Sequence, residues 1–396
     1  MLKDKIQQLA KAYFDDVVTM RRHLHENPEL SYQEVKTGNF VAQKLKEYNI
    51  PYVHGIAENG VVGLIEGRNP HKKIIALRAD LDALPIHEAN NVPYKSTVQG
   101  VMHACGHDAH TSSLLGAAKI LNNIKDHFEG TIKLIFQPAE EKTPGGASIM
   151  IKEGVLDNPK PLSIIGQHVH PPLEAGKVGL KGGIYMASSD ELYLTIRGKG
   201  GHGAMPQECV DTILIAAHII TALQQVVSRN ADPSLPTVLT LGKINSVGGA
   251  TNVIPDEVRI EGTFRTLNET WRKEAKLRIK KIAEGIAESM GGACIVTIEH
   301  GYPVLFNDEA LTKKVKDFMI EYAGKDNVID LPMRMTSEDF AYYSQAMPAC
   351  FYRLGTGNKA KGITSGLHTD TFDIEESSLE LSIGMLAWLA VKELGN

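Results

Sequence analysis

The chain is 396 residues long and 43% hydrophobic, and its 42 Lys and Arg against 47 Asp and Glu leave a formal net charge of −5. A chain of this length is too long for one ordinary hydrophobic core, so we expect two domains. The chain is mildly acidic and no run of basic residues stands out, which argues against a polyanionic partner such as nucleic acid.

The N-terminal segment and the cysteines bear on localisation. Residues 1–24 are amphipathic and of mixed charge, without the apolar stretch of a secretory signal. No window approaches the roughly 18 apolar residues that a membrane span needs. Scattered cysteines in a chain of this size favour a reducing compartment over a disulfide framework. We therefore expect a cytoplasmic protein without membrane contact. The cysteines are Cys105, Cys209, Cys294 and Cys350.

The first half of the chain alternates strand and helix patterns. Residues 111–121 carry apolar side chains at helical spacing, between the second and third of four short apolar runs. Strands that are apolar on both sides, alternating with helices, predict an α/β domain with a mostly parallel central sheet and helices on both faces. The four predicted strands cover residues 61–65, 74–77, 132–136 and 162–165.

The middle of the chain has a different order of elements. A helix starts at the cap Asn268 and stops at Gly291, with apolar residues at steps of three and four. An earlier helix covers 211–229, and strands are predicted at 191–196, 238–244, 257–264 and 294–299. The order β-α-β-β-α-β is ferredoxin-like. We expect an inserted domain at 184–298, flanked by 1–183 and 299–396, which together form the other domain.

The densest chemical signal is the segment 102–110, MHACGHDAH, which comes directly before the first predicted helix. Thiolate, imidazole and carboxylate are the side-chain groups that bind zinc and similar ions. Three histidines, one cysteine and one aspartate within nine residues therefore indicate a metal site rather than a plain polar loop. They are His103, Cys105, His107, Asp108 and His110.

Two adjacent glutamates, Glu140 and Glu141, follow the apolar strand at 132–136. The ends of strands are where α/β proteins place catalytic groups. Adjacent carboxylates at such an edge repel each other unless a cation compensates. One glutamate can then bind metal while the other takes a proton from the attacking water.

Three further segments offer ligands or supporting groups. His168 and His170 follow the strand at 162–165 and face the same way in a strand, so that one suits a metal ligand and the other a supporting role. Asp82 follows the strand at 74–77 and suits a carboxylate that orients a metal-bound histidine. His368 near the C-terminus is a candidate metal ligand only if the fold brings it close to the other segments.

Two segments of the inserted domain carry hydrogen-bond donors instead of metal-ligand spacings. His202 lies in the glycine-rich turn 198–206, and Asn252 precedes the strand that carries Arg265. Such donors can hold a carboxylate or a developing oxyanion. Ligands that are mixed, far apart in sequence and rich in carboxylate predict a metal hydrolase, because a structural zinc uses a closed set of Cys and His at short spacing.

These motifs resemble the family of metal-dependent aminoacylases, hippurate hydrolases, auxin-conjugate hydrolases and related carboxypeptidases. The segments 102–110 and 137–141 are highly specific for it, and the similarity runs through the full length. Supporting segments are 21–31, 78–85, 198–206, 252–255, 337–340 and 367–368.

The resemblance implies a zinc-peptidase-like catalytic domain with an inserted lid and dimerisation domain. It implies Glu140 as general base and acid, Asp82 as a supporting carboxylate, and His202 as an oxyanion donor that reaches the neighbouring subunit's site. Asn252 and Arg265 would bind the substrate's α-carboxylate. The implied ligands of a metal pair are Cys105, His107, Glu141, His168 and His368.

The implied reaction is hydrolysis of an N-acyl-L-amino acid, with an acetyl, benzoyl or similar acyl group, by a homodimer or higher homo-oligomer with two divalent ions per subunit. Zinc is the first expectation, and manganese, cobalt and nickel also suit these ligands. Two positions depart from many relatives: Gln207 replaces a histidine after Met-Pro, and Asp370 replaces a proline. Gln207 bears on substrate preference and Asp370 on the loop that presents His368.

Three alternatives remain open at this point. A dipeptidase or carboxypeptidase of the same family is the main competitor. A cysteine hydrolase using Cys105 with His107 or His110 would survive chelation, and the glutamate pair disfavours it. A metal-storage protein would bind metal without hydrolysing anything.

Overall fold

The structure is a computed structural model that describes residues 2–395. The chain forms two compact units. The larger unit comprises Met1–Tyr185, Phe306–Pro332 and Asp339–Asn396, and the smaller unit comprises Met186–Leu305 and Met333–Glu338. The short return segment Met333–Glu338 packs with the smaller unit, which no pattern in the sequence indicates.

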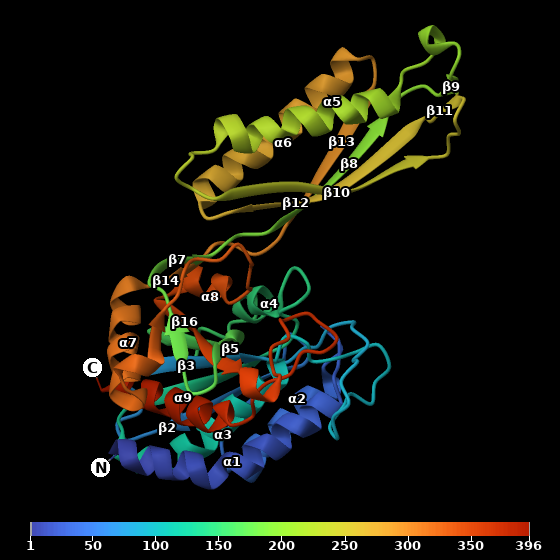
Figure 1. Cartoon of the computed structure of the whole chain (residues 1–396). Coiled ribbons are helices and arrows are strands. Elements are labelled where there is room, and N and C mark those ends of the chain that lie inside the picture. Colours follow the sequence, from blue (N-terminus) through green and yellow to red (C-terminus); the bar gives the residue numbers. More distant parts are fainter. Residues whose placement is uncertain (1, 396) are drawn as a thin grey trace. The chain divides into compact units, whose positions relative to one another are not determined.

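The larger unit is built on an eight-stranded sheet of order β1-β2-β4-β3-β5-β16-β6-β15 (Figure 1). Its centre is parallel, since β4, β3, β5 and β16 run in one direction. Antiparallel pairs join β1 to β2, β2 to β4 and β16 to β6, and the edge strand β15 is parallel to β6. The predicted mostly parallel sheet is confirmed. The strands are β1 Tyr52–Ile56, β2 Gly60–Glu66, β3 Ile74–Asp80, β4 Thr131–Gln137, β5 Ser163–Glu174, β6 Val178–Leu180, β15 Val328–Asp330 and β16 Ala349–Gly357.

Helices cover both faces of this sheet (Figure 1). The helices α1, α3, α7 and α9 pack together on one face and α4 and α8 on the other, while α2 lies against β1, β2 and α3. The bounds are α1 Leu2–Glu26, α2 Val35–Glu47, α3 His107–Asn123, α4 Gly146–Lys152, α7 Glu309–Ala323, α8 Ala341–Ala346 and α9 Ser378–Leu394.

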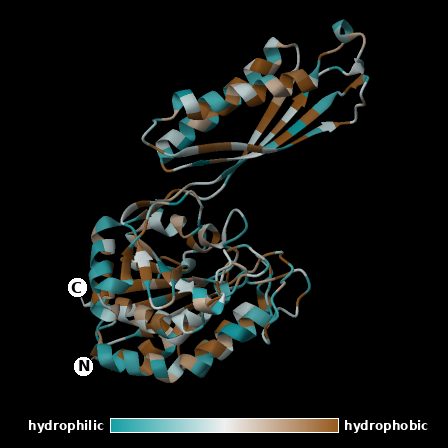
Figure 2. Ribbon diagram, viewed as in Figure 1, coloured by the Kyte–Doolittle hydropathy of each residue, from teal (hydrophilic) through white to brown (hydrophobic). Residues whose placement is uncertain are grey.

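The sheet's burial explains why its strands are apolar on both sides. Every residue of β4 and of β16 is buried, and the central strands are mostly hydrophobic (Figure 2). Because β3 and β4 are parallel neighbours with Asp80 opposite Gln137, the loops that follow them start at the same edge of the sheet. That edge is where α/β folds hold their functional groups.

The smaller unit has the ferredoxin-like order predicted from the sequence. Its antiparallel sheet has the order β10-β12-β8-β13, and α5 and α6 pack together against it. The side chain of Asn268 caps α6 by accepting the Trp271 backbone N–H at 2.9 Å. The elements are β8 Asp190–Arg197, α5 Thr212–Gln225, η3 Val226–Asn230, β10 Thr237–Val247, β12 Glu257–Thr266, α6 Glu269–Ser289 and β13 Ala293–His300.

Among the described residues, one helical stretch, Thr212–Asn230, is long and apolar enough to cross a membrane. No such window was expected from the sequence. The stretch buries Ile215, Ile219 and Leu223 in the core of the smaller unit. Since a core helix meets the same criteria of length and composition, the stretch is weak evidence for a membrane span.

Candidate active site

A tight turn at Gly106 presents two of the predicted metal ligands. Gly106 has a φ of 81°, in the left-handed region that favours glycine, and a Cβ there would lie 2.5 Å from Val169 Cγ2. Cys105 precedes the turn, and His107 is the first residue of α3. The predicted helix therefore starts four residues earlier than its apolar pattern indicates, and it carries His107 and His110 as well.

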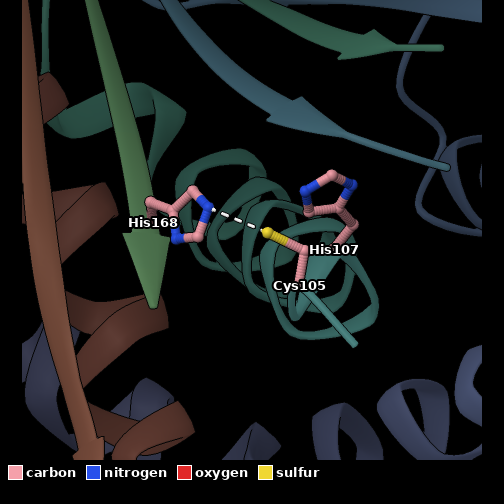
Figure 3. Close-up of side chains that lie close together, drawn as sticks. All are labelled: Cys105, His107 and His168. Atoms are coloured by element: carbon pink, nitrogen blue, oxygen red, sulfur yellow. Dashed lines mark hydrogen bonds between the residues drawn. The ribbon is translucent and has the colours of Figure 1, made fainter. Parts of the chain in front are cut away.

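His168, on β5, points at the same place (Figure 3). Its Nε2 lies 3.4 Å from the Sγ of Cys105, while its Nδ1 lies 2.8 Å from the carbonyl of Val169 and donates to it. The bond at Nδ1 leaves Nε2 as the atom with a free lone pair. Cys105, His107 and His168 each offer one ligand atom, and these atoms lie within 4.8 Å of one another.

The glutamate pair follows β4 through a strained turn. Ala139 has a φ of 52°, and its backbone N–H donates to the carboxylate of Glu34 at 2.7 Å, which holds the turn. Glu140 and Glu141 then face His107, whose Nε2 lies 3.9 and 4.0 Å from their nearest oxygens.

His368 comes from a loop 200 or more residues further along the chain than the other proposed ligands and still reaches the cluster. Its Nε2 lies 3.1 Å from Glu141 Oε1, and its backbone N–H donates to the carbonyl of Ala104 at 2.8 Å. The residue adopts a φ of 60°, and its side chain is 51% exposed. Cys105, Glu141 and His368 form a second group whose ligand atoms lie within 4.8 Å of one another. The carbonyl of Asp370 accepts the Ala89 N–H, which ties down the same loop.

The donor set fits a metal pair. Within residues 2–395, His107 Nε2 is buried and has no hydrogen-bond partner, although oxygens of Asp80, Glu140 and Glu141 surround it at 3.8 to 4.0 Å. Two ligands that share one ion by bonds of about 2 Å lie roughly 3 to 4 Å apart. The 4.0 Å between this nitrogen and Glu141 Oε1 therefore suits a shared cation, and Cys105 belongs to both of the three-residue groups described above.

The pKa shifts of His107 and Cys105 also favour a bound cation. Burial by itself lowers the pKa of His107, but Asp80 and Asp82 outweigh it and raise that pKa to about 10. Burial, together with Glu141 and Glu140, raises the pKa of the Cys105 thiol well above its usual value. In both cases neighbouring carboxylates place negative charge at a buried position, and a divalent cation would neutralise that charge.

Asp82 makes the contacts that its predicted supporting role requires. Its Oδ1 lies 3.1 Å from His107 Nδ1, and its Oδ2 accepts bonds from Ser31 Oγ at 2.6 Å and from the backbone N–H of Glu141 at 2.9 Å. The residue is buried, so these bonds are shielded from water.

Two of the three predicted donors of the smaller unit, His202 and Asn252, lie together, and Arg265 lies apart from them. His202 on β9, Gly201–His202, is exposed and lies beside Asn252, which precedes β11, Val253–Ile254. Half-buried Arg265 lies near the other end of β12 and donates to Met335 O and Ser337 Oγ. Eight residues of extended strand, roughly 26 Å, separate the two ends. Gln207 lies in an exposed turn, Pro206–Glu208.

Three further buried residues lie next to this cluster, namely Arg78, Asp80 and His110, and each is at most 1% exposed. From the sequence, Arg78 and Asp80 had no predicted role, and His110 was considered as part of the segment 102–110 and as a partner of Cys105 in a cysteine hydrolase. Arg78 and Asp80 in the buried strand β3 were the available signal, because charged side chains in a strand buried on both faces need dedicated partners.

A mostly parallel α/β sheet, a ferredoxin-like insert and a buried cluster of Cys, His and Glu beside a further glutamate define the class of metal-dependent hydrolases. Residues 76–392 match the model of Peptidase family M20/M25/M40, and the chain belongs to that family.

Relatives in this family carry names for amide hydrolysis. The chain is 40% identical to "IAA-amino acid hydrolase ILR1-like 4" of Arabidopsis thaliana, over 99% of this chain and 89% of the relative. It is 43% identical to "N-acyl-L-amino acid amidohydrolase" of Geobacillus stearothermophilus, over 78% and 83%. It is 38% identical to "Thermostable carboxypeptidase 2" of Saccharolobus solfataricus, over 99% and 98%.

Solved structures agree with the fold. A putative aminohydrolase from methicillin-resistant Staphylococcus aureus superposes with a TM-score of 0.92 at 35% identity, covering 99% of this chain and all of that one. A Bacillus subtilis protein described as a dinuclear metal-binding peptidase of family M20 superposes with a TM-score of 0.83 at 34% identity, covering 97% and 99%. The chain is therefore a metallo-hydrolase by family, as the sequence predicted.

Proposed function

We propose that this protein hydrolyses the amide bond of N-acyl-L-amino acids, releasing a carboxylic acid and a free amino acid, with two divalent metal ions per subunit. The observation that carries the proposal is the meeting of five donor side chains from four distant segments beside Glu140, a further buried carboxylate. The names of the relatives support the substrate class.

The proposed ligands are Cys105, His107, Glu141, His168 and His368. Bound divalent ions lower the pKa of water and polarise a carbonyl, which is the chemistry an amide needs. The native ion is proposed to be zinc, and manganese, cobalt and nickel suit the same mixed ligands.

Glu140 is proposed as the proton carrier of the reaction. Its carboxylate, 6% exposed and 3.9 Å from His107 Nε2, can accept a proton from the attacking water and return it to the leaving amine nitrogen. Asp82 keeps the ring of His107 and the backbone of Glu141 in place for this step.

His202, Asn252 and Arg265 are proposed to bind substrate, with His202 serving the site of a second subunit. His202 is exposed and far from Arg265 along the smaller unit, which supports a site completed by two copies of the chain. We propose that the smaller unit is a lid and dimerisation module and that the homodimer works in the cytoplasm. Exposed apolar residues Ile244, Val247 and Val253 support a contact surface there.

A carboxypeptidase or dipeptidase activity is the second candidate, because one of the relatives carries a carboxypeptidase name. One experiment separates the two. The metal-free protein is refilled with a single metal and assayed on acetyl, benzoyl and indole-acetyl amino acids and on dipeptides. We expect at least tenfold higher kcat/KM on acyl amino acids. Preference for dipeptides would favour the second candidate, and no hydrolysis with any metal would reject both.

A further inference from the structure

Arg78 is a fully buried guanidinium in β3, beside the candidate site. It donates to Asp80 Oδ2 at 2.6 Å, to Asp339 Oδ1 at 2.7 Å and to Gln137 Oε1 at 2.9 Å. A buried ion costs several kcal/mol of desolvation unless hydrogen bonds and opposite charge compensate it. The partners of Arg78 supply both, so its position is tightly determined.

The side chain of Asp80 connects Arg78 to His110. One carboxylate oxygen of Asp80 accepts from Arg78, and the other lies 2.6 Å from His110 Nδ1. Each oxygen of the carboxylate thus has a charged or ring N–H partner, and the two bonds fix its position from both sides. His110 therefore keeps its Nδ1 proton directed at Asp80.

The second nitrogen of His110 reaches a metal-ligand strand. His110 Nε2 lies 2.8 Å from the backbone nitrogen of Val169, and since that N–H can only donate, Nε2 must be the acceptor. The ring is thus held as the neutral tautomer with its proton on Nδ1. The carbonyl of the same Val169 accepts the Nδ1 proton of His168.

The peptide unit next to His168 is consequently held from two directions. His110 fixes the N–H of Val169, and the carbonyl of Val169 fixes the ring of His168, whose Nε2 then faces Cys105 at 3.4 Å. A shift of Val169 would turn this nitrogen away from the thiol.

We propose that His110 is a positioning residue for the metal ligand His168, anchored through Asp80 by the buried guanidinium of Arg78. The inference rests on the proposed function for the ligand role of His168. Residues that orient a metal ligand typically change metal affinity or activity by 10- to 100-fold when they are replaced.

The test replaces His110 and not Arg78, because Arg78 also holds Asp339 and Gln137 and its loss would disturb more than one contact. His110→Phe keeps a flat ring and removes both bonds. His110→Gln keeps a polar group that can still accept from the Val169 N–H. His103→Phe is the matched control, since His103 lies in the same buried turn and, within residues 2–395, neither of its ring nitrogens has a hydrogen-bond partner.

Zinc affinity of the full-length protein is measured by competition with a chromogenic chelator, and Co²⁺ absorption reports the ligand geometry. We expect His110→Phe to weaken zinc binding 10- to 100-fold and to change the Co²⁺ spectrum. In His110→Gln, at least a third of this loss in zinc affinity, on a logarithmic scale, should be recovered. The control should stay within twofold of wild type. At saturating metal, kcat of His110→Phe should return to within about fivefold of wild type.

An affinity of His110→Phe within twofold of His103→Phe would overturn the proposal. If His110→Phe fails to fold, as judged by circular dichroism, His110→Gln carries the test. A zinc affinity more than twofold below that of His103→Phe, or an altered Co²⁺ spectrum, supports the proposal, and an affinity within twofold with an unaltered spectrum overturns it. Neither measurement needs substrate. An absence of hydrolysis by the wild-type protein would therefore count against the proposed function alone.

Discussion

The carboxylate of Asp82 links His107 to the glutamate pair. One oxygen lies 3.1 Å from His107 Nδ1, and the other accepts the backbone N–H of Glu141 at 2.9 Å. A single side chain thereby sets the orientation of one proposed ligand and the backbone position of another. This arrangement explains why His107 Nε2, the far side of the ring, faces carboxylates rather than a hydrogen-bond partner.

Replacement of Asp82 should therefore weaken metal binding. We expect Asp82→Ala to lower zinc affinity about 10- to 100-fold, because the ring of His107 loses its hydrogen-bond acceptor. The measurement is equilibrium competition with a chelator. Asp157→Ala, at an exposed position of the same unit, is the control, and equal affinities in the two variants would contradict the role of Asp82.

Glu140→Gln should separate metal binding from turnover. The amide keeps the size of the side chain but cannot carry a proton, so kcat should fall about 10²- to 10⁴-fold. Metal content per subunit, measured by atomic emission, should stay at the wild-type value. Glu141→Gln serves as the contrast and should lose metal as well. A fully active Glu140→Gln in a metal-replete sample would rule out its role as base.

His202→Ala should reduce kcat at least tenfold, since loss of one oxyanion donor typically costs about 3 kcal/mol. His71→Ala, at an exposed position of the larger unit, should have no effect. Random pairing of His202→Ala with Glu140→Gln should restore roughly a quarter of wild-type activity, because half of the two-fold dimers then contain one intact site. A loss smaller than twofold in His202→Ala, or no recovery in the mixture, would refute the role across subunits.

The four cysteines should differ in reactivity in the metal-free protein. Burial and the neighbouring Glu141 and Glu140 raise the pKa of Cys105, so at pH 7.5 it is a buried thiol and not a thiolate. We expect iodoacetamide to modify the partly exposed Cys209 at least tenfold faster, as followed by peptide mass spectrometry. Chelation should abolish activity and alkylation of Cys209 should not. Rapid modification of Cys105 with activity lost in parallel, and activity that survives chelation, would instead favour a cysteine hydrolase.

Glu34 should make the stability of the metal-free protein depend on pH. Burial and then the charge of Asp82 raise the pKa of Glu34 from 4.5 to about 7 in the folded chain. Because its pKa is higher in the folded state, Glu34 binds its proton more tightly there than in the unfolded state. Its contribution to the free energy of unfolding is therefore largest at low pH and is lost as the pH rises through 7.

The measurement for Glu34 compares wild type with Glu34→Gln by urea unfolding. The free energy of unfolding of wild type, relative to Glu34→Gln, should fall by about 2 kcal/mol between pH 5 and pH 8. Glu66→Gln, at an exposed strand end, is the control and should show no such trend. A difference between wild type and Glu34→Gln that is constant with pH would contradict the shifted pKa.

Much of the fold follows from local patterns in the sequence. Alternating apolar runs and helical stripes predicted β2, β3, β4, the start of β5, α3 and the six elements of the smaller unit, because the periods of strands and helices are imposed by burial on one or two faces. The specific segments 102–110 and 137–141 predicted which residue types would meet.

The tertiary structure decided what local patterns do not encode. The approach of His368 to Glu141, the bond from His110 to Val169 and the separation of His202 from Arg265 depend on loops, on strand register and on contacts between residues far apart in the chain. The start of α3 at His107 was set by the left-handed turn at Gly106 and not by apolar spacing. Sequence fixes the periodicity of each segment, whereas the distances between segments arise only when the whole core packs.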